Sequence, residues 1–432
     1  MSDPALLKTL ITRGQAAIGD RDLVPRDVAL PQAKNKLLTI TGIRRCGKSS
    51  LMRMQADALL RSGVDRKCFV FLNLEDDRLE PAHTTLDQVL RAYQELHPDI
   101  PLAKVHFFLD EVQAMPRWDR FVLRLHEEER AHVMVTGSNA KVLAKEIATT
   151  LRGRSLNIPL MPFSFSERLR LKNLDLDPFL PGDAAKLANE MRDQIQWGGF
   201  PEVITMDHGF RYRLLQEYFD VMLFRDLLER YGIQQPVVLK HFLKRVLTSA
   251  AKPMSVRKMD LDLRSAGLKT TKDLLYAWMD HAQAIHLVMR SEPFGAHARE
   301  RLSGKTKYYA TDNGLLSAMS FNFQDEWGRL LENAVAVEAV RQGAALTHFQ
   351  GKHECDFILL RDERPWKAVQ ACWSLRDADT RKRELAGLAE ACKGLGLKNG
   401  VIITADATED LKVEGINIQV RPFREAGVLL SR

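Results

Sequence analysis

Residues 42–50, GIRRCGKSS, constrain the fold more than any other stretch, because two glycines and a lysine follow the apolar run KLLTI. The pattern is G-x-x-x-x-G-K-[ST], with Lys48 and Ser49 at its end. Glycines let a loop turn so tightly that several backbone N–H groups point at one anion. The lysine then reaches the β- and γ-phosphates, the serine hydroxyl is placed for Mg²⁺, and the next helix contributes its positive end. The pattern predicts a phosphate-binding P-loop; a glycine turn beside a surface lysine is the alternative.

Short apolar runs alternate with helical patterns over the first part of the chain. The runs KLLTI, CFVFLNL, KVHFFLD, HVMVTGS and SLNIPL predict an α/β fold, a parallel sheet covered by helices. The third run ends in Asp110 and Glu111, at the edge where parallel sheets bind ligands. Asp110 is expected to hold Mg²⁺ with Ser49, and Glu111 to orient and deprotonate the attacking water. An acidic pair that caps a helix is the alternative.

Polar and basic residues flank the last two of these runs. Ser138 and Asn139 follow HVMVTGS and can contact the γ-phosphate or the attacking water, although loop capping explains them as well. Arg152 and Arg154 are candidates to stabilise charge on the transferring phosphoryl group, in the same or a neighbouring subunit; ordinary surface arginines are the alternative. The expected nucleotide contacts in the loop itself are Gly42, Arg45, Cys46, Gly47, Lys48, Ser49 and Ser50.

Composition narrows the class of protein. The apolar fraction of 45% and charged fraction of 28% are typical of a soluble globular chain, and no apolar run approaches the roughly 20 residues of a membrane span. We therefore expect a cytoplasmic protein. The five cysteines are scattered and never spaced as C-x-x-C, so the sequence indicates neither a disulfide framework nor a zinc site.

Positive charge is concentrated in the middle of the chain. Residues 240–315 hold 14 Lys or Arg against 7 Asp or Glu, an excess equal to the net charge of +7. Three helical patterns followed by the strand KTKYYATD predict a winged helix-turn-helix, with Thr270 or Thr271 capping the recognition helix. DNA binding is the favoured interpretation, and a lid or docking surface is the alternative. The DNA-binding candidates are Lys269, Lys272, Tyr276, Arg299, Arg301, Lys305 and Lys307.

These motifs together resemble the prokaryotic AAA-like ATPases related to the STAND class. The resemblance is carried by GIRRCGKSSL, FFLDEVQ, VMVTGSNAKVL, GRSLNIPLMPFSFSE, WGGFPEV and LFRDLLERYGI, and it continues through KYYATDNGLL, LENAVAVE and ECDFIL. It thus covers nearly the whole chain. The resemblance implies an ATPase joined to a winged helix and to a tail similar to PD-(D/E)xK nucleases. It also implies that Gly199 and Pro201 lie against the adenine.

The C-terminal part departs from the nuclease pattern that it resembles. Such nucleases hold Mg²⁺ with acids from adjacent strands and place a lysine two positions after the last acid. Glu332 and Asp356 fit the first two places, with Glu354 as a further candidate. At the third place the chain has Gln370, and Cys372 stands where the lysine is expected. Lys367 is close in sequence, but we expect it on the wrong face of its strand, so a fold kept for binding or assembly is favoured.

The sequence therefore predicts four segments: a P-loop NTPase (AAA-like) core at 1–163, a helical lid at 164–233, a winged helix-turn-helix at 234–320 and a small restriction-endonuclease-like α/β domain at 321–432. The leading hypothesis is a Mg²⁺-dependent, ATP-hydrolysing switch that forms a homo-oligomer and acts on DNA. One alternative is an ATP-regulated, metal-dependent DNA nuclease. The other is an interaction scaffold that ATP locks in one conformation with little turnover.

Overall fold

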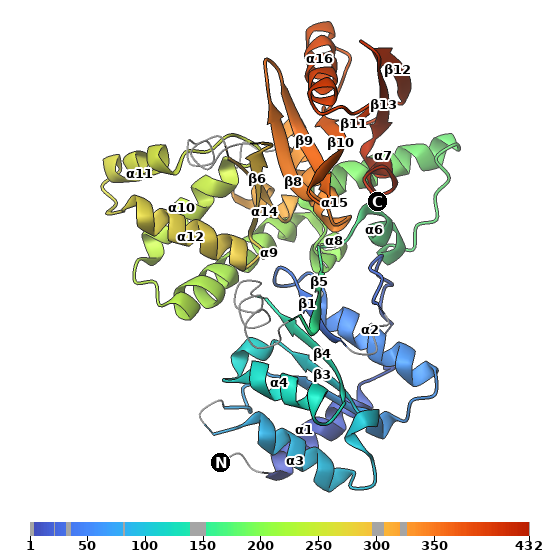
Figure 1. The fold of residues 1–432 in the computed structure, drawn as a ribbon, viewed down its shortest axis with the longest axis vertical. Helices are drawn as coiled ribbons and strands as arrows, with labels where there is room; N and C mark the ends of the chain where they lie inside the picture. The colour runs from blue at the N-terminus through green and yellow to red at the C-terminus, as the bar shows by residue number, and fades with distance from the viewer. Residues whose placement is uncertain are drawn as a thin grey trace. The chain divides into compact units, whose positions relative to one another are not determined.

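The computed structural model describes residues 4–20, 22–31, 36–80, 83–138, 153–295, 306–319 and 326–431. The chain forms two compact units (Figure 1). The first comprises Met1–Leu160 with Ala284–His286, and the second comprises Met161–Gln283 with Leu287–Arg432. Their boundary lies close to the one expected after residue 163, whereas the boundaries expected after residues 233 and 320 fall inside the second unit. Within the described residues, no helix is both long and apolar enough to cross a membrane.

The first unit is built on a five-stranded parallel sheet, and all five expected strands are confirmed. They are β1 (Leu37–Thr41), β2 (Phe69–Asn73), β3 (His106–Asp110), β4 (His132–Gly137) and β5 (Ser155–Pro159). Their order across the sheet is β2-β3-β4-β1-β5. Because the strands are parallel, the carboxyl ends of β1, β4 and β3 meet side by side at one edge.

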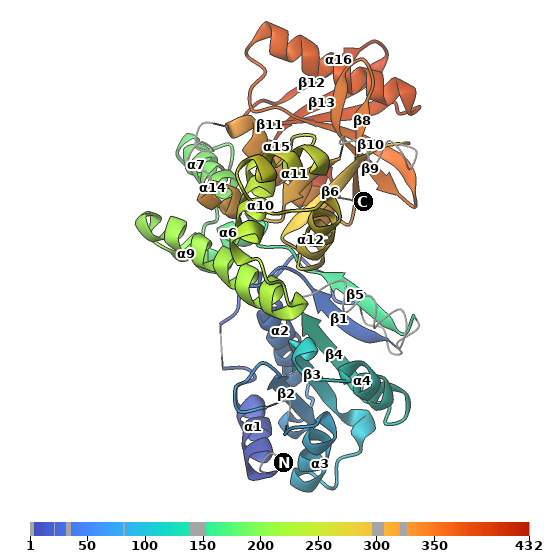
Figure 2. The same ribbon diagram turned by 90° about the vertical axis from the view of Figure 1, so that its left-hand side faces the viewer.

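Helices cover both faces of this sheet, and Figure 2 shows α2 and α4 on opposite sides of β3 and β4. On one face, α1 (Pro4–Ala16), α3 (Leu86–Leu96) and α4 (Trp118–Glu127) share a buried core with alternate strand residues such as Val70 and Leu72. The intervening residue Phe71 points the other way, where Arg53 of α2 (Lys48–Arg61) lies 4.5 Å from its ring. Short 3₁₀ turns precede or follow strands at Arg66–Cys68, Leu102–Lys104 and Val112–Ala114.

A stacked pair of histidines lies at the amino ends of β3 and β4. His106 and His132 are register partners, and their ring centroids are 4.4 Å apart. His106 also lies 5.7 Å from the ring of Phe69. Burial lowers the pKa of His106 to about 4, and His132 acts in the same direction. Burial likewise lowers the pKa of His132, so the folded unit favours two neutral rings.

We expect acid to weaken the first unit through this pair. The ordinary pKa of His106 is 6.5, so the unfolded chain takes up a proton that the folded chain resists. The free energy of unfolding should therefore fall as the pH drops from 6.5 towards 4. His106→Phe keeps an aromatic ring against Phe69 and removes the titration, so it should flatten the decline. Denaturant unfolding at neutral pH and between the two pKa values tests this, and an unchanged pH dependence in the variant would contradict it.

The second unit joins a helical part to an eight-stranded mixed sheet. Its helices are α6 (Phe165–Leu171), α7 (Pro181–Trp197), α8 (Pro201–Thr205), α9 (His208–Val221), the π-helical η5 (Met222–Glu229), α10 (Pro236–Thr248), α11 (Val256–Ser265), α12 (Lys272–Ala284), α14 (Asn313–Met319), α15 (Trp327–Arg341), α16 (Ala378–Gly394), η7 (Phe423–Glu425) and α17 (Ala426–Leu429). Its strands are β6 (Val288–Pro293), β7 (Lys307–Ala310), β8 (Ala345–Gln350), β9 (Glu354–Arg361), β10 (Arg364–Ala371), β11 (Asn399–Thr404), β12 (Glu409–Val413) and β13 (Ile416–Pro422).

The eight strands run in the order β12-β13-β11-β10-β9-β8-β6-β7. The antiparallel pair β6–β7 follows α10, α11 and α12, in the element order expected for three helices and a hairpin. However, β6 also pairs in parallel with β8, through Glu292 with Thr347 and Pro293 with His348. The hairpin and the C-terminal strands therefore form one sheet, not the separate C-terminal domain that the sequence predicted after residue 320.

Candidate nucleotide-binding site

The loop between β1 and α2 has the backbone that its glycines predict. A Cβ atom on Gly42 would lie 2.3 Å from the carbonyl oxygen of Leu160, so the loop passes too close to its neighbour for a side chain. Gly47 caps α2 in the left-handed region, with φ 100°. α2 then begins at Lys48, which directs its amino-terminal N–H groups towards the same loop. These features fit a cradle for phosphate oxygens.

The ammonium group of Lys48 is held inside this loop. The side chain is 4% exposed, and Nζ donates hydrogen bonds to the carbonyl oxygens of Gly42 at 3.1 Å and Ile43 at 3.3 Å. Nζ also lies 3.5 Å from Oε1 of Glu111, which follows β3 on the far side of β4. A positive charge is thus positioned at the loop by backbone and carboxylate oxygens.

Asp110 is the last residue of β3, and it contacts Ser49. Hydrogen bonds from Ser49 and from the hydroxyl of Thr136 reach its carboxylate. Burial raises the pKa of Asp110, and these two hydrogen bonds only partly offset that effect. A carboxylate and a hydroxyl in contact beside a phosphate cradle are oxygen ligands of the kind that Mg²⁺ takes, so the two residues fit the expected metal position.

Glu111 is fixed by contacts on both its backbone and its carboxylate. Its backbone lies in the left-handed region, with φ 52°, and its N–H donates to the hydroxyl of Thr136 at 3.0 Å. Oε2 accepts hydrogen bonds from the backbone N–H of Ser138 at 3.1 Å and from Gln113 at 2.5 Å. Burial alone would raise the pKa of Glu111, but Lys48 and these partners more than offset it, so the pKa lies below its usual value. The side chain makes no capping bond to the 3₁₀ turn after it, so helix capping does not account for Glu111.

Ser138 follows β4 and brings a third polar group to the same edge. It is 1% exposed, and its Oγ has no hydrogen-bond partner in the described part of the chain. A buried hydroxyl without a partner is costly, and a ligand that accepts or donates at this position would remove the cost. Its position beside Glu111 fits contact with a phosphate oxygen or with the attacking water.

Arg154, the remaining catalytic candidate that the structure describes, is not brought to this edge. Arg154 precedes β5, its carbonyl accepts a bond from the N–H of Leu37, and its side chain pairs with Glu127. Since Leu37 opens β1 and β5 is parallel to it, Arg154 lies at the edge opposite the P-loop of its own chain. Asn139 and Arg152 fall outside the described residues.

Sequence reasoning missed two arginines: Arg44, which belongs to the loop, and Arg26, which contacts it from outside. Arg26 donates from Nη1 to the carbonyl of Cys46 at 2.9 Å, and a Cβ on Gly47 would lie 3.2 Å from the same nitrogen. Arg44 pairs with Glu75 at 3.2 Å, and its charge also lowers the pKa of Glu111. Arg26 has no spacing signal, because it lies in an irregular segment before β1.

Of the other loop candidates, Arg45 and Ser50 are exposed, and the Cys46 thiol is fully buried.

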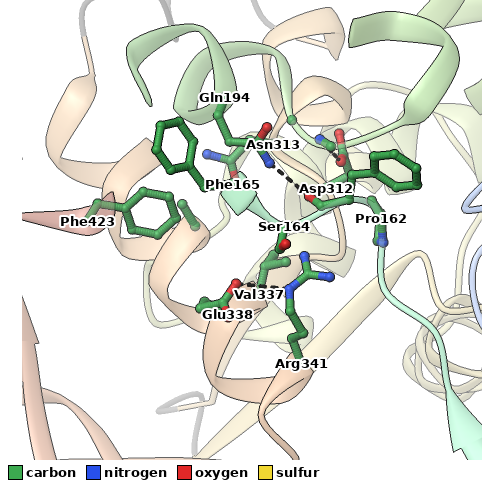
Figure 3. A pocket seen from close by; sticks show the side chains of 14 residues that line it. Pro162, Ser164, Phe165, Gln194, Asp312, Asn313, Val337, Glu338, Arg341 and Phe423 are labelled. Atoms are coloured by element: carbon green, nitrogen blue, oxygen red, sulfur yellow. Dashed lines mark hydrogen bonds and ion pairs between the residues drawn. The ribbon is translucent and has the colours of Figure 1, made fainter. Parts of the chain in front are cut away.

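Gly199 of WGGFPEV has a structural task inside the second unit, where it contacts Asp312, which is labelled in Figure 3. The N–H of Gly199 donates to the buried carboxylate of Asp312 at 2.7 Å, and a Cβ on Gly199 would lie 2.2 Å from the carbonyl of Phe163. The N–H of Gly314 donates to the same carboxylate at 2.8 Å. Burial raises the pKa of Asp312 to about 7 despite these donors. Pro201 begins α8.

Asn313, next to Asp312, ties the same region together. Its side-chain amide donates to the carbonyls of Ile195 at 2.6 Å and Leu330 at 2.7 Å. These bonds hold the end of α7 and the start of α15 to α14. Figure 3 shows the small pocket beside this network, where Glu338 and Arg341 of α15 lie paired. Packing and hydrogen bonding thus explain these motif residues, and the adenine contact implied for Gly199 and Pro201 stays a prediction.

The DNA-binding candidates that the structure describes comprise an exposed group and one buried residue. Lys269, Lys272 and Tyr276 are exposed at the start of α12, and Thr271 caps that helix by accepting a bond from the N–H of Leu274 at 3.2 Å. Lys307 is 3% exposed inside a cluster of acids and is not available to DNA, which corrects the expectation for that residue. Arg299, Arg301 and Lys305 fall outside the described residues.

Two family models match this chain. Residues 34–169 match a family described as an AAA domain, and residues 188–326 match one described as a domain of unknown function (DUF8612). The first match supports a P-loop ATPase domain in this chain.

Similar proteins span most of the chain. An uncharacterized protein of Methanocaldococcus jannaschii is 27% identical over 412 residues, covering 94% of this chain and 86% of its own length. An uncharacterized protein of Haemophilus influenzae is 26% identical, with 88% and 91% covered. Among solved structures, a Walker-type ATPase of Pyrococcus abyssi is 14% identical, with 74% of this chain and 96% of that chain covered and a TM-score of 0.42. Caenorhabditis elegans PCH-2 is 15% identical, with 44% and 47% covered and a TM-score of 0.21.

Removing the Lys48 side chain should weaken nucleotide binding. Charge-assisted hydrogen bonds are worth about 1.5–3 kcal/mol, so Lys48→Ala should weaken the affinity for ATP by about 10- to 100-fold. Titration with a fluorescent ATP analogue tests this, with the exposed Lys104→Ala as the matched control and thermal unfolding to confirm the fold. Equal affinities for Lys48→Ala and the parent would contradict the site.

Proposed function

We propose that this chain binds ATP with Mg²⁺, hydrolyses it, and uses the bound nucleotide to switch between conformations. One observation carries the proposal: the P-loop and the end of β3 meet twice, through Lys48 with Glu111 and through Ser49 with Asp110. The match of residues 34–169 to an AAA domain supports the same assignment.

The proposed roles follow from these positions. The loop N–H groups and Lys48 bind the phosphates, and Asp110 and Ser49 hold the metal ion. Bound Mg²⁺ would neutralise charge on the β- and γ-phosphates. Glu111 is fixed by Ser138 and Gln113, and its lowered pKa keeps it ionised and able to accept a proton from water. In the arrangement described here Glu111 faces Lys48 at 3.5 Å, so phosphates that attract the ammonium would free the carboxylate for this task.

The proposal includes assembly of several copies. Arg154 lies at the sheet edge opposite its own P-loop, so a role on the transferring phosphate requires the nucleotide of a neighbouring subunit. Measuring the mass of the protein in solution with ADP and with ATP tests whether several copies assemble.

Glu111→Gln should separate binding from hydrolysis. The amide keeps the size of the side chain but cannot accept the proton, and general-base catalysis contributes about 10²- to 10⁴-fold. We expect ATP affinity to change little and turnover to fall by about that factor. Glu128→Gln removes an exposed acid from the same unit and is the matched control. Equal turnover in Glu111→Gln and the parent would exclude Glu111 as the base, whereas binding without turnover in the parent itself would favour the scaffold alternative.

We also propose that the amino-terminal part of α12 binds DNA. Lys269 and Lys272 are exposed within one turn of its start, and Tyr276 is exposed one turn later. α12 is the third helix of a predicted helix-turn-helix. Lysines at the start of such a helix can contact DNA phosphates without reading the base sequence. The excess of positive charge in residues 240–315 supports the same partner.

A salt titration tests the DNA proposal. Each lost phosphate contact should reduce the slope of log affinity against log salt by about 1, so Lys269→Glu with Lys272→Glu should reduce it by about 2. Lys412→Glu changes an exposed lysine on β12 and should not alter the slope. If the double variant and the parent bind duplex DNA equally at every salt concentration, this helix is a docking surface instead.

A further inference from the structure

A buried lysine occupies the centre of the acidic cluster in the second unit. Lys307, the first residue of β7, is 3% exposed. Its Nζ lies 2.6 Å from Oε1 of Glu354, 3.0 Å from Oε1 of Glu332 and 3.5 Å from Oδ1 of Asp356. These carboxylates come from α15 and β9, so three acids from two elements converge on one ammonium group.

The surroundings keep this lysine charged. Burial alone would lower the pKa of Lys307, but Glu332, Asp356 and Glu354 raise it above its usual value. Tyr309, two residues along β7, donates its hydroxyl to the same oxygen of Glu332 at 2.8 Å. Lys307 and Tyr309, which lie on the same face of β7, therefore both donate hydrogen bonds to the acidic cluster.

No oxygen from β10 completes a metal site here. The amide oxygen of Gln370 accepts the N–H of Asp356 at 3.1 Å, and its amide nitrogen donates to Glu384 at 2.5 Å. The second oxygen of Asp356 accepts the N–H of Ala371 at 3.0 Å. Over the described residues, no group of three or more His, Cys, Asp or Glu side chains is arranged to hold a metal ion.

We propose that Lys307 is a built-in counter-ion that takes the place of a divalent cation among Glu332, Glu354 and Asp356, so that the cluster binds a divalent metal only when this lysine is removed. The contacts fit a structural task as well. The ladder between β6 and β8 has only two residue pairs, and the ammonium group links β7 to α15 and β9 across it. This inference is independent of the proposed ATPase activity.

The test is a Mn²⁺ titration of the full chain without nucleotide, followed by electron paramagnetic resonance of free Mn²⁺. Lys307→Met keeps the length of the side chain and removes the charge. We expect this variant to bind about one more Mn²⁺ ion per chain than the parent does. Its unfolding temperature should be lower than that of the parent without Mn²⁺ and should rise when Mn²⁺ is added. The added Mn²⁺ should be lost again when Asp356→Asn is combined with Lys307→Met. Lys367→Met, on β10 of the same sheet, is the matched control and should gain nothing.

Two results would overturn the proposal. One is a Lys307→Met chain that folds and binds no more Mn²⁺ than the parent. The other is a parent chain whose Mn²⁺ binding, or Mn²⁺-dependent cleavage of DNA, disappears in Asp356→Asn, since the native cluster would then hold metal. The comparison of the parent with Asp356→Asn remains decisive if Lys307→Met does not fold.

Discussion

The ion pair between Lys48 and Glu111 is the interaction on which the proposed chemistry depends. It exists because parallel strands end at the same edge, which brings a loop after β1 and an acid after β3 within 3.5 Å across the intervening β4. The two neighbouring acids at this edge have pKa values shifted in opposite directions. Lys48 keeps the buried carboxylate of Glu111 ionised, whereas Asp110, held by two hydroxyls, has a raised pKa. A divalent ion at Asp110 would supply the charge that these hydroxyls lack.

Local sequence patterns predicted the first unit well. Five apolar runs became five parallel strands, and the glycine spacing and acidic pair came together as expected, because each depends on neighbours close in sequence or on the regular order of parallel strands. Arg26 escaped prediction, since a lone arginine in an irregular segment carries no period or spacing. Arg154 was a candidate for the phosphate of its own or a neighbouring subunit, and the direction of β5 places it away from its own P-loop.

The second unit was harder to predict because its key contacts join segments far apart in the chain. Lys307 had the pattern of a basic wing residue, and only the three-dimensional fold brings it to Glu332 and Asp356. Gly199 matched a motif associated with adenine, yet its close approach to Phe163 and its bond to Asp312 already require a glycine. The sequence alone does not show whether a lysine lies on the surface or in a buried acidic cluster. Nor does it show whether a glycine contacts a nucleotide or a neighbouring backbone.

The short join between β6 and β8 has a consequence for how the second unit opens. Neighbouring strands such as β8 and β9 are held by longer ladders. By contrast, β6 and β8 share two residue pairs, an adjacent backbone bond from Phe294 to His348, and a side-chain bond between Ser291 and His348 at 3.2 Å. Local unfolding follows the path that breaks the fewest bonds. The amide hydrogens along this join should therefore exchange with solvent before those of β9 to β11, and a protease that recognises transiently exposed strands would find its earliest target there.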